Sequence, residues 1–179
     1  GDAEGHTMVL DAADGREIVE LRGHQRAVRA LAFFDGNGSL LTAGDDHRLL
    51  AWELASARVT RAFAGHDDIV QSVALSPDQA YAVTASSDRT ARVWSLGHDD
   101  GSTLQFGESW RPAIRALAYS PDGTRLVIGN ERGAVRLLDA DSWRPLAERD
   151  VPGEGCMAAS FAPDGSRIAL AVGVGSLVL

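Results

Sequence analysis

The chain repeats itself at a spacing of 42 residues, and this repeat limits its possible folds more than any other feature. A Gly-His pair occurs at His24 and again at His66, and Trp52 has a counterpart in Trp94. Both offsets are 42 residues. Two unrelated residue types that share one offset indicate a true internal repeat. A period of roughly 40 to 45 residues is typical of propellers and solenoids, in which each repeat is one supersecondary unit.

Within each period, short β-type runs alternate with polar turns. Apolar residues follow His24 at Val28, Leu31 and Phe33, and the last two have the period-two spacing of a strand with one buried face. A turn rich in Pro, Asp and Gly comes next, in which Pro presets the backbone angle φ. The second strands are predicted at residues 39–43, 80–85, 125–129 and 167–171. Because four short runs fit one period and no helical pattern separates them, each repeat is predicted to be a four-stranded antiparallel sheet.

The order of motifs in the first two periods closely resembles the WD40 repeat. Each period has a Gly-His pair, a first strand, a tight turn, a Thr, an Asp four residues on, and a Trp six residues after that Asp. The matching positions are His24, Thr42, Asp46 and Trp52 in one unit and His66, Thr84, Asp88 and Trp94 in the next. Glu53 and Ser95 depart from the Trp-Asp pair of the family. The resemblance implies an all-β fold, a β-propeller built from four-stranded antiparallel blades.

The third and fourth periods keep the spacing but lose most of the motif residues. Trp110 and Pro152 stand at the histidine positions, Arg132 at an Asp position and Leu138 at a Trp position. About four blades are therefore expected, two of them degenerate. Their units are approximately 11–52, 53–94, 95–138 and 139–179, and residues 1–10 belong to a preceding blade. Because rings of this family usually have more blades, residues 1–179 are expected to be part of a larger ring or of a ring completed by another chain.

By the same resemblance, the His, Thr, Asp and Trp side chains of the first two units form a structural hydrogen-bond network rather than a catalytic triad. A buried indole N–H and a buried imidazole need partners, and a complete chain of them fixes strand register. The sequence predicts no catalytic residue, no metal site and no cofactor. The five histidines, which do not converge as metal ligands do, are His6, His24, His47, His66 and His98.

Composition excludes several classes of partner. The formal net charge is −8, and all 17 basic residues are Arg because the chain contains no Lys. An acidic chain without a basic stripe is not expected to bind nucleic acid. No apolar stretch approaches the ~20 residues needed to span a bilayer, so no membrane contact is predicted. Cys156 falls at an apolar first-strand position and cannot form an internal disulfide, and a cytoplasmic location is therefore expected.

The sequence predicts a binding module, whose partner is a protein or peptide held on the loops and turns at one end of the sheets. The candidate contact residues are Gln25, Arg26, Asp45, Asp67, Asp68, Ser87, Arg111 and Arg132. Taken one at a time, each is better explained as an ordinary solvated loop residue. As a patch they are mixed in charge, which suits a protein better than a nucleic acid.

Two further expectations concern the context of the module. The lack of Lys beside abundant Ala, Arg and Gly indicates a GC-rich, bacterial genome. In bacterial multidomain proteins, repeats of this kind resemble scaffold or sensor regions attached to kinases, NTPases or caspase-like proteases. Two alternative functions stay open, namely a propeller enzyme with a site in the central channel and a self-assembling structural module.

Overall fold

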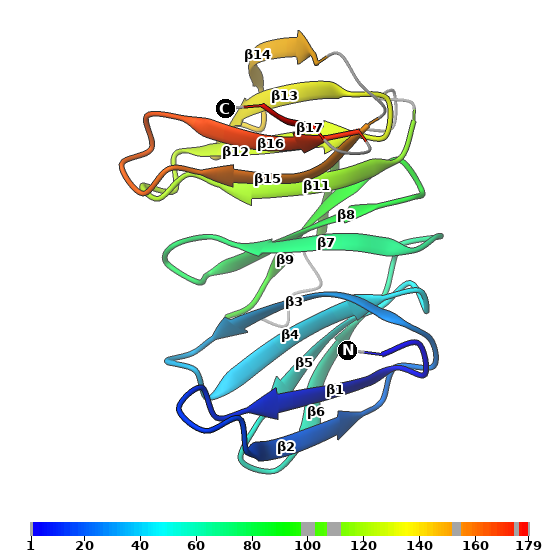
Figure 1. Ribbon diagram of the computed structural model, residues 1–179. Coiled ribbons are helices and arrows are strands. Elements are labelled where there is room, and N and C mark those ends of the chain that lie inside the picture. Colours follow the sequence, from blue (N-terminus) through cyan, green and yellow to red (C-terminus); the bar gives the residue numbers. More distant parts are fainter. Residues whose placement is uncertain (1, 98–102, 107–111, 152–154, 174–175, 179) are drawn as a thin grey trace.

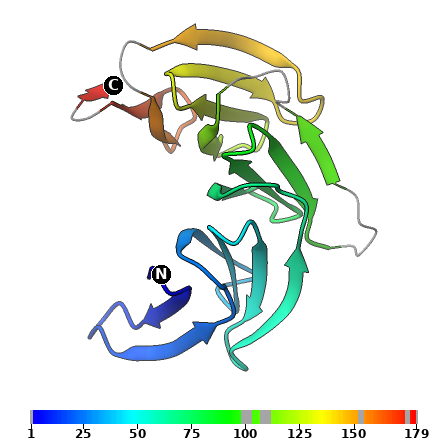
Figure 2. The same cartoon turned by 90° about the vertical axis from the view of Figure 1, so that its right-hand side faces the viewer.

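The computed structural model describes residues 2–97, 103–106, 112–151, 155–173 and 176–178, and every regular element in these ranges is a β-strand. Figure 1 shows the strands gathered into successive sheets. In Figure 2, which is turned by 90°, the sheets follow one another around an arc that stays open. The all-β fold predicted from the sequence is confirmed. Within the described ranges, no helix has the length and hydrophobicity needed to cross a bilayer.

Three sheets have four strands each, paired antiparallel in chain order. The first contains β3 (Val28–Phe34), β4 (Ser39–Gly44), β5 (Leu49–Glu53) and β6 (Arg58–Phe63). The second contains β7 (Val70–Leu75), β8 (Tyr81–Ser86), β9 (Ala91–Ser95) and β10 (Thr103–Phe106). The third contains β11 (Ile114–Tyr119), β12 (Arg125–Asn130), β13 (Ala134–Asp139) and β14 (Pro145–Asp150). The predicted four-stranded antiparallel blades are therefore present.

Smaller sheets lie at the two ends of the arc. One pairs β1 (His6–Leu10) with β2 (Glu17–Arg22), and the other consists of β15 (Cys156–Phe161), β16 (Ile168–Val172) and β17 (Ser176–Val178). Each repeat unit of the sequence joins the outer strand of one sheet to three strands of the next. Unit 11–52, for example, contains β2 and then β3, β4 and β5.

The first strand of each large sheet lies on the inner side of the arc, where β3 contacts β7, β7 contacts β11, and β11 contacts β15. Figure 2 shows this inner row of strands. Apolar side chains fill the space between neighbouring sheets. Leu41 and Phe63 of the first sheet, for example, pack in one cluster with Val70 and Trp94 of the second. Removing such side chains from water is the main force that holds one sheet against the next.

The turns that follow the inner strands are closed by their own side chains. In the second sheet, the Ser76 hydroxyl donates to Asp78 Oδ1 and accepts a 3.0 Å hydrogen bond from the backbone N–H of Tyr81. The corresponding Ser120 and Asp122 repeat these contacts in the third sheet. A Ser and an Asp that bond the backbone locally favour a tight turn over continued strand. The Ser-Pro-Asp motif therefore sets where the inner strands of the second and third sheets end.

The predicted burial of Leu31 and Phe33 is wrong. On β3 these side chains are 47% and 45% exposed, whereas their counterparts on β7, Val73 and Leu75, pack against the first sheet. A strand face is buried only when another sheet covers it. The small sheet of β1 and β2 packs its apolar side chains on a cluster that includes Trp52 and leaves the outward face of β3 open.

Candidate interaction face

A chain of hydrogen bonds joins two strands of the first sheet, β4 and β5, to the loop before β3 and the turn after β4. The Trp52 indole N–H donates to Thr42 Oγ1 over 2.7 Å, His24 Nε2 lies 2.7 Å from the same oxygen, and His24 Nδ1 lies 2.8 Å from Asp46 Oδ1. An ionised carboxylate can only accept, so His24 Nδ1 carries the proton and donates to Asp46. His24 Nε2 then accepts from the Thr42 hydroxyl. Every donor in the chain thus meets an acceptor.

The second sheet contains the same chain with one addition. The Trp94 indole donates to Thr84 over 2.8 Å, Thr84 lies 2.7 Å from His66 Nε2, and His66 Nδ1 lies 2.7 Å from Asp88 Oδ2. Thr90 adds two bonds to Asp88 Oδ1, from its hydroxyl over 2.6 Å and from its N–H over 2.8 Å. Burial opposes ionisation of Asp88, but the hydrogen bonds from His66 and Thr90 outweigh it and hold the pKa of this carboxyl well below its usual range.

Both networks are closed to solvent. The side chains of His24 and His66 are 0% and 1% exposed, and those of Asp46 and Asp88 are 5% and 8% exposed. The Thr42 and Thr84 hydroxyls are buried between the His and Trp rings. A catalytic nucleophile must be reachable by its substrate, and these hydroxyls are not.

The networks also hold the loops that precede the inner strands. The backbone N–H of Gln25 donates to Asp46 over 3.1 Å, and the backbone N–H of Asp67 donates to Asp88 over 3.1 Å. A buried carboxylate thereby fixes the loop residue that directly follows each network histidine. Gln25 and Asp67, both predicted contact residues, are exposed on this fixed backbone.

A row of polar side-chain pairs lies at the same end of the sheets. Each pair joins the second residue of an inner strand to the first residue after the second strand, 16 positions later in all three sheets. The pairs, which we call the paired row, are Arg29–Asp45 at 2.8 Å, Gln71–Ser87 at 2.8 Å and Arg115–Glu131 at 3.1 Å. The hydrogen bond from Arg29 lowers the pKa of Asp45 and keeps it charged. The row therefore presents groups of both signs.

Most of the residues predicted to contact a partner lie on this face. Gln25, Arg26, Asp67 and Arg132 are exposed, and Asp45, Asp68 and Ser87 are partly buried. Arg111, His98, Trp110 and Pro152 lie outside the described residues. The sequence interpretation missed Arg29, Gln71, Arg115 and Glu131. Their constant 16-residue separation was the signal that could have identified them.

The third sheet closes its turn without the network. Ile128 and Leu138 occupy the positions of the network Thr and Trp, and both are buried. The amide oxygen of Asn130 accepts from the backbone N–H groups of Arg132 and Ala134, both over 3.0 Å. Apolar packing thus replaces the buried chain, and Asn130 closes the turn that carries the exposed Arg132.

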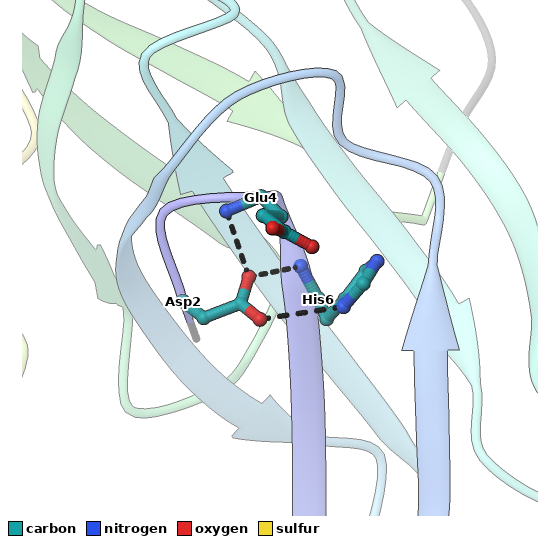
Figure 3. A group of neighbouring side chains, drawn as sticks. All are labelled: Asp2, Glu4 and His6. Atoms are coloured by element: carbon teal, nitrogen blue, oxygen red, sulfur yellow. Dashed lines mark hydrogen bonds and ion pairs between the residues drawn. The ribbon is translucent and has the colours of Figure 1, made fainter.

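One further group of side chains has the spacing of metal ligands. The ligand atoms of Asp2, Glu4 and His6 lie within 4.8 Å of one another near the start of β1 (Figure 3). Asp2 Oδ1 accepts from the backbone N–H groups of Glu4 over 3.0 Å and His6 over 2.8 Å, and Asp2 Oδ2 lies 3.3 Å from His6 Nδ1. These local bonds account for the grouping, and we assign no metal to it.

Comparisons with known proteins agree with this architecture. The family profile described as "WD domain, G-beta repeat" matches residues 15–53 and 57–95. The chain is 28% identical to apoptotic protease-activating factor 1 of Rattus norvegicus over 80% of its length. It is 27% identical to eukaryotic translation initiation factor 3 subunit I of Aspergillus fumigatus over 68% of its length, and 27% identical to autophagy-related protein 16 of Arabidopsis thaliana over 94%. The matches span only 12%, 36% and 33% of these relatives.

Proposed function

Because this chain carries WD40 repeats, as its motifs predicted, we propose that it is a non-catalytic module that binds a protein or peptide. The observation that carries the proposal is the paired row, which joins the start of each inner strand to the turn after the second strand and, in the first two sheets, lies beside loops that the buried networks hold. Groups that are already held in place lose little conformational freedom on binding. The paired row is therefore a preorganised contact surface.

The chemistry of the paired row suits a folded or extended polypeptide. Arg29 is 48% exposed and Arg115 is 33% exposed, so each keeps guanidinium N–H groups for a partner in addition to those that bond the paired acid. Neighbouring positive and negative groups favour a partner with the complementary pattern and disfavour a uniformly charged polymer. We take this as support for a protein ligand.

The non-catalytic part of the proposal rests on the buried networks. The central hydroxyls, those of Thr42 and Thr84, each accept a hydrogen bond from an indole and donate to an imidazole, and the Thr90 hydroxyl donates to Asp88. All of that hydrogen-bonding capacity is used inside the sheet. We propose that each network holds the strands of its own blade in register and does no chemistry.

We further propose that the module is a scaffold or sensor region of a larger cytoplasmic protein from a bacterium. An effector such as a kinase, an NTPase or a caspase-like protease would lie elsewhere in that protein. The support is the short span of the matched relatives that this chain covers, together with the Arg-only basic composition. The relatives compared above are eukaryotic, so the bacterial source rests on composition alone.

A capture experiment with matched variants tests the contact surface. Wild-type chain, the double variant Arg29→Glu with Arg115→Glu, and a control with Arg58→Glu and Arg149→Glu serve as baits, and bound proteins are quantified and then titrated individually. Arg58 and Arg149 are exposed on the outer strands β6 and β14, whereas Arg29 and Arg115 of the paired row lie on the inner strands β3 and β11. Partners should be kept by the control and lost by the paired-row variant. Equal retention by both variants, with equal thermal unfolding midpoints, would contradict the proposal.

A second candidate function, self-assembly, is favoured by the exposed side chains of Leu31 and Phe33. The equivalent side chains of the next sheet are covered by a neighbouring blade, so this face is shaped to receive one. Large apolar groups exposed side by side mark contact surfaces. We propose that further blade strands cover them, either in cis or from a second copy.

A further inference from the structure

A pocket of about 620 Å³ lies between the second and third sheets. It is formed by the turns after β7, β11 and β13, which are at the end of the strands opposite the paired row. Its walls combine aromatic rings and acids, namely Tyr81, Tyr119, Trp143, Asp78, Asp122 and Asp141. No basic side chain lines it among the described residues. The pocket is thus both aromatic and acidic.

The acids of the two Ser-Pro-Asp turns are held in the ionised form. The Ser120 hydroxyl and the Thr124 N–H and hydroxyl donate to Asp122 Oδ1, and these bonds lower the pKa of Asp122 to about 2. Bonds from the Ser76 hydroxyl and a backbone N–H likewise lower the pKa of Asp78. Within the described residues, every hydrogen bond to either acid uses Oδ1. The second oxygen of each carboxylate remains able to accept from a ligand.

The aromatic side chains supply broad faces beside these charges. Tyr119 and Trp143 are partly buried against the core, and Tyr81 is 47% exposed. Burial is the main cause that raises the pKa of Tyr119, and the nearby Asp78 and Tyr81 add to it. The phenol is therefore neutral, and its hydroxyl makes no hydrogen bond among the described residues.

Trp143 occupies a backbone conformation that disfavours bulky side chains. Its φ is 59°, in the left-handed region, and the equivalent turn position of the first sheet is Ala57 with φ 55°. The turn itself thus needs no indole. An aromatic residue in a strained backbone conformation beside a pocket indicates a role in binding a ligand.

The aromatic lining belongs to this boundary and not to the repeat. At the boundary between the first and second sheets, the positions of Tyr81 and Tyr119 are taken by Ser39 and Leu75. The repeat pattern requires only a strand start and an inner-strand residue at these places. Two tyrosines that face each other across one boundary are therefore a local feature.

Negative charge beside aromatic faces is the chemistry that binds organic cations. A guanidinium fits best, because its planar fork donates in pairs to carboxylates while its face stacks on a ring. The volume lies within the ~300–1,000 Å³ typical of ligand sites, which leaves room for a whole side chain and its flanking backbone. The net charge of −8 also attracts a basic partner over longer range.

We propose that this pocket binds an arginine side chain of a peptide segment from another protein, with the guanidinium between the aromatic rings and the carboxylates. Asp78 and Asp141 contribute most, since the charge of Arg125 already acts on Asp122. The site is separate from the paired row, so an experiment that refutes one binding surface leaves the proposal for the other unaffected.

The first test titrates the purified chain with the tripeptide acetyl-Gly-Arg-Gly-amide and follows backbone and indole N–H signals by NMR. Saturable shifts are expected at Tyr119, Asp141 and Trp143 and not at Arg29. The citrulline tripeptide, a neutral isostere, should bind about tenfold more weakly or worse. Equal binding of the citrulline peptide, equally tight binding of the lysine peptide, or shifts confined to other regions would overturn the proposal.

The second test uses variants that change charge and keep shape. Asp78→Asn retains Oδ1 for its turn, and the carboxylate of Asp141 makes no hydrogen bond among the described residues. Together, Asp78→Asn and Asp141→Asn should weaken arginine binding about tenfold. The matched control is Asp164→Asn, which alters the same turn position of the next sheet, outside the pocket.

The control variant should bind the arginine tripeptide as the wild type does. An equal loss in the control, or no loss in the double variant, would refute the assignment of the acids. If the variants do not fold, the comparison of arginine with citrulline on the wild-type chain still decides the question.

Discussion

Replacing Asp88 with Ala should destabilise the second sheet more than any surface change. Asp88 accepts hydrogen bonds from His66 Nδ1, from the N–H of Asp67, and from both the N–H and the hydroxyl of Thr90. Its side chain is only 8% exposed, so water cannot readily replace the lost acceptor. The substitution leaves the buried His66 Nδ1–H with only its longer contact, 3.3 Å to Thr90 Oγ1.

The size of the effect follows from these contacts. A hydrogen bond to a charged group contributes about 1.5–3 kcal/mol net, and the contributions do not add because they share one carboxylate. Four donors lose this acceptor, and a buried donor left unsatisfied costs about 1–3 kcal/mol. Asp88→Ala should therefore lower the free energy of unfolding by about 3–5 kcal/mol. Asp88→Asn keeps an acceptor and should lower it by about 1–3 kcal/mol.

Urea unfolding followed by circular dichroism measures this difference. Asp67→Ala is the matched control, because Asp67 is the adjacent acid, is exposed, and bonds Asp88 only through its backbone N–H. No change in midpoint is expected for the control. A loss below about 1 kcal/mol for Asp88→Ala, or an equal loss for Asp67→Ala, would refute the reasoning.

The same carboxylate predicts a dependence on pH. The pKa of Asp88 is lower in the folded chain than in the unfolded chain, where an Asp titrates near pH 3.9. The folded state thus binds fewer protons, and the stabilisation is complete above about pH 4 and is lost as the pH falls toward the lowered pKa. The stability difference between wild type and Asp88→Asn should therefore shrink below about pH 4. A constant difference down to pH 2 would contradict this.

Two other variants test the packing of two sheets and the self-assembly proposed for the open face. A Cβ at Gly129 would lie 2.5 Å from Cys156 Sγ, so Gly129→Ala must push the third sheet away from the sheet of β15, β16 and β17. The variant should lower the free energy of unfolding in urea by about 1–3 kcal/mol, and an unchanged midpoint would contradict this. Leu31→Glu with Phe33→Glu should give monomers at concentrations where wild type self-associates, as measured by light scattering. A wild-type chain that stays monomeric counts against self-assembly.

Much of the strand order could be predicted because each repeat contains its own signals. The second strand predicted at residues 39–43 is β4 (Ser39–Gly44), and the strand predicted at 125–129 is β12 (Arg125–Asn130). Cys156 is fully buried, as its alignment with apolar first-strand positions predicted. Alternation of apolar residues and turn residues such as Pro is a local property, so it can be read without knowing the neighbours.

Side-chain contacts between strands of one sheet can be predicted only when the register of those strands is known. The contact between Arg29 and Asp45 was not predicted from the sequence, because polar residues near turns are usually solvated. The role of Asn130 was not predicted either, because its amide does the work of the network Asp from a different position of the turn. The Arg29–Asp45 contact follows from strand pairing, which places residues 16 positions apart side by side, whereas the bonds of Asn130 lie within one turn.

The sequence by itself predicted the repeat and the four-stranded unit from its period, and the participants in the buried networks from the resemblance of its motifs to the WD40 repeat. Only the tertiary structure decided what lies between units: the open face at Leu31 and Phe33, and the aromatic and acidic pocket beside Tyr119. The physical reason is that a period describes what one repeat shares with the next. The space between two sheets is lined by side chains in which those repeats differ, and its shape depends on how both sheets pack.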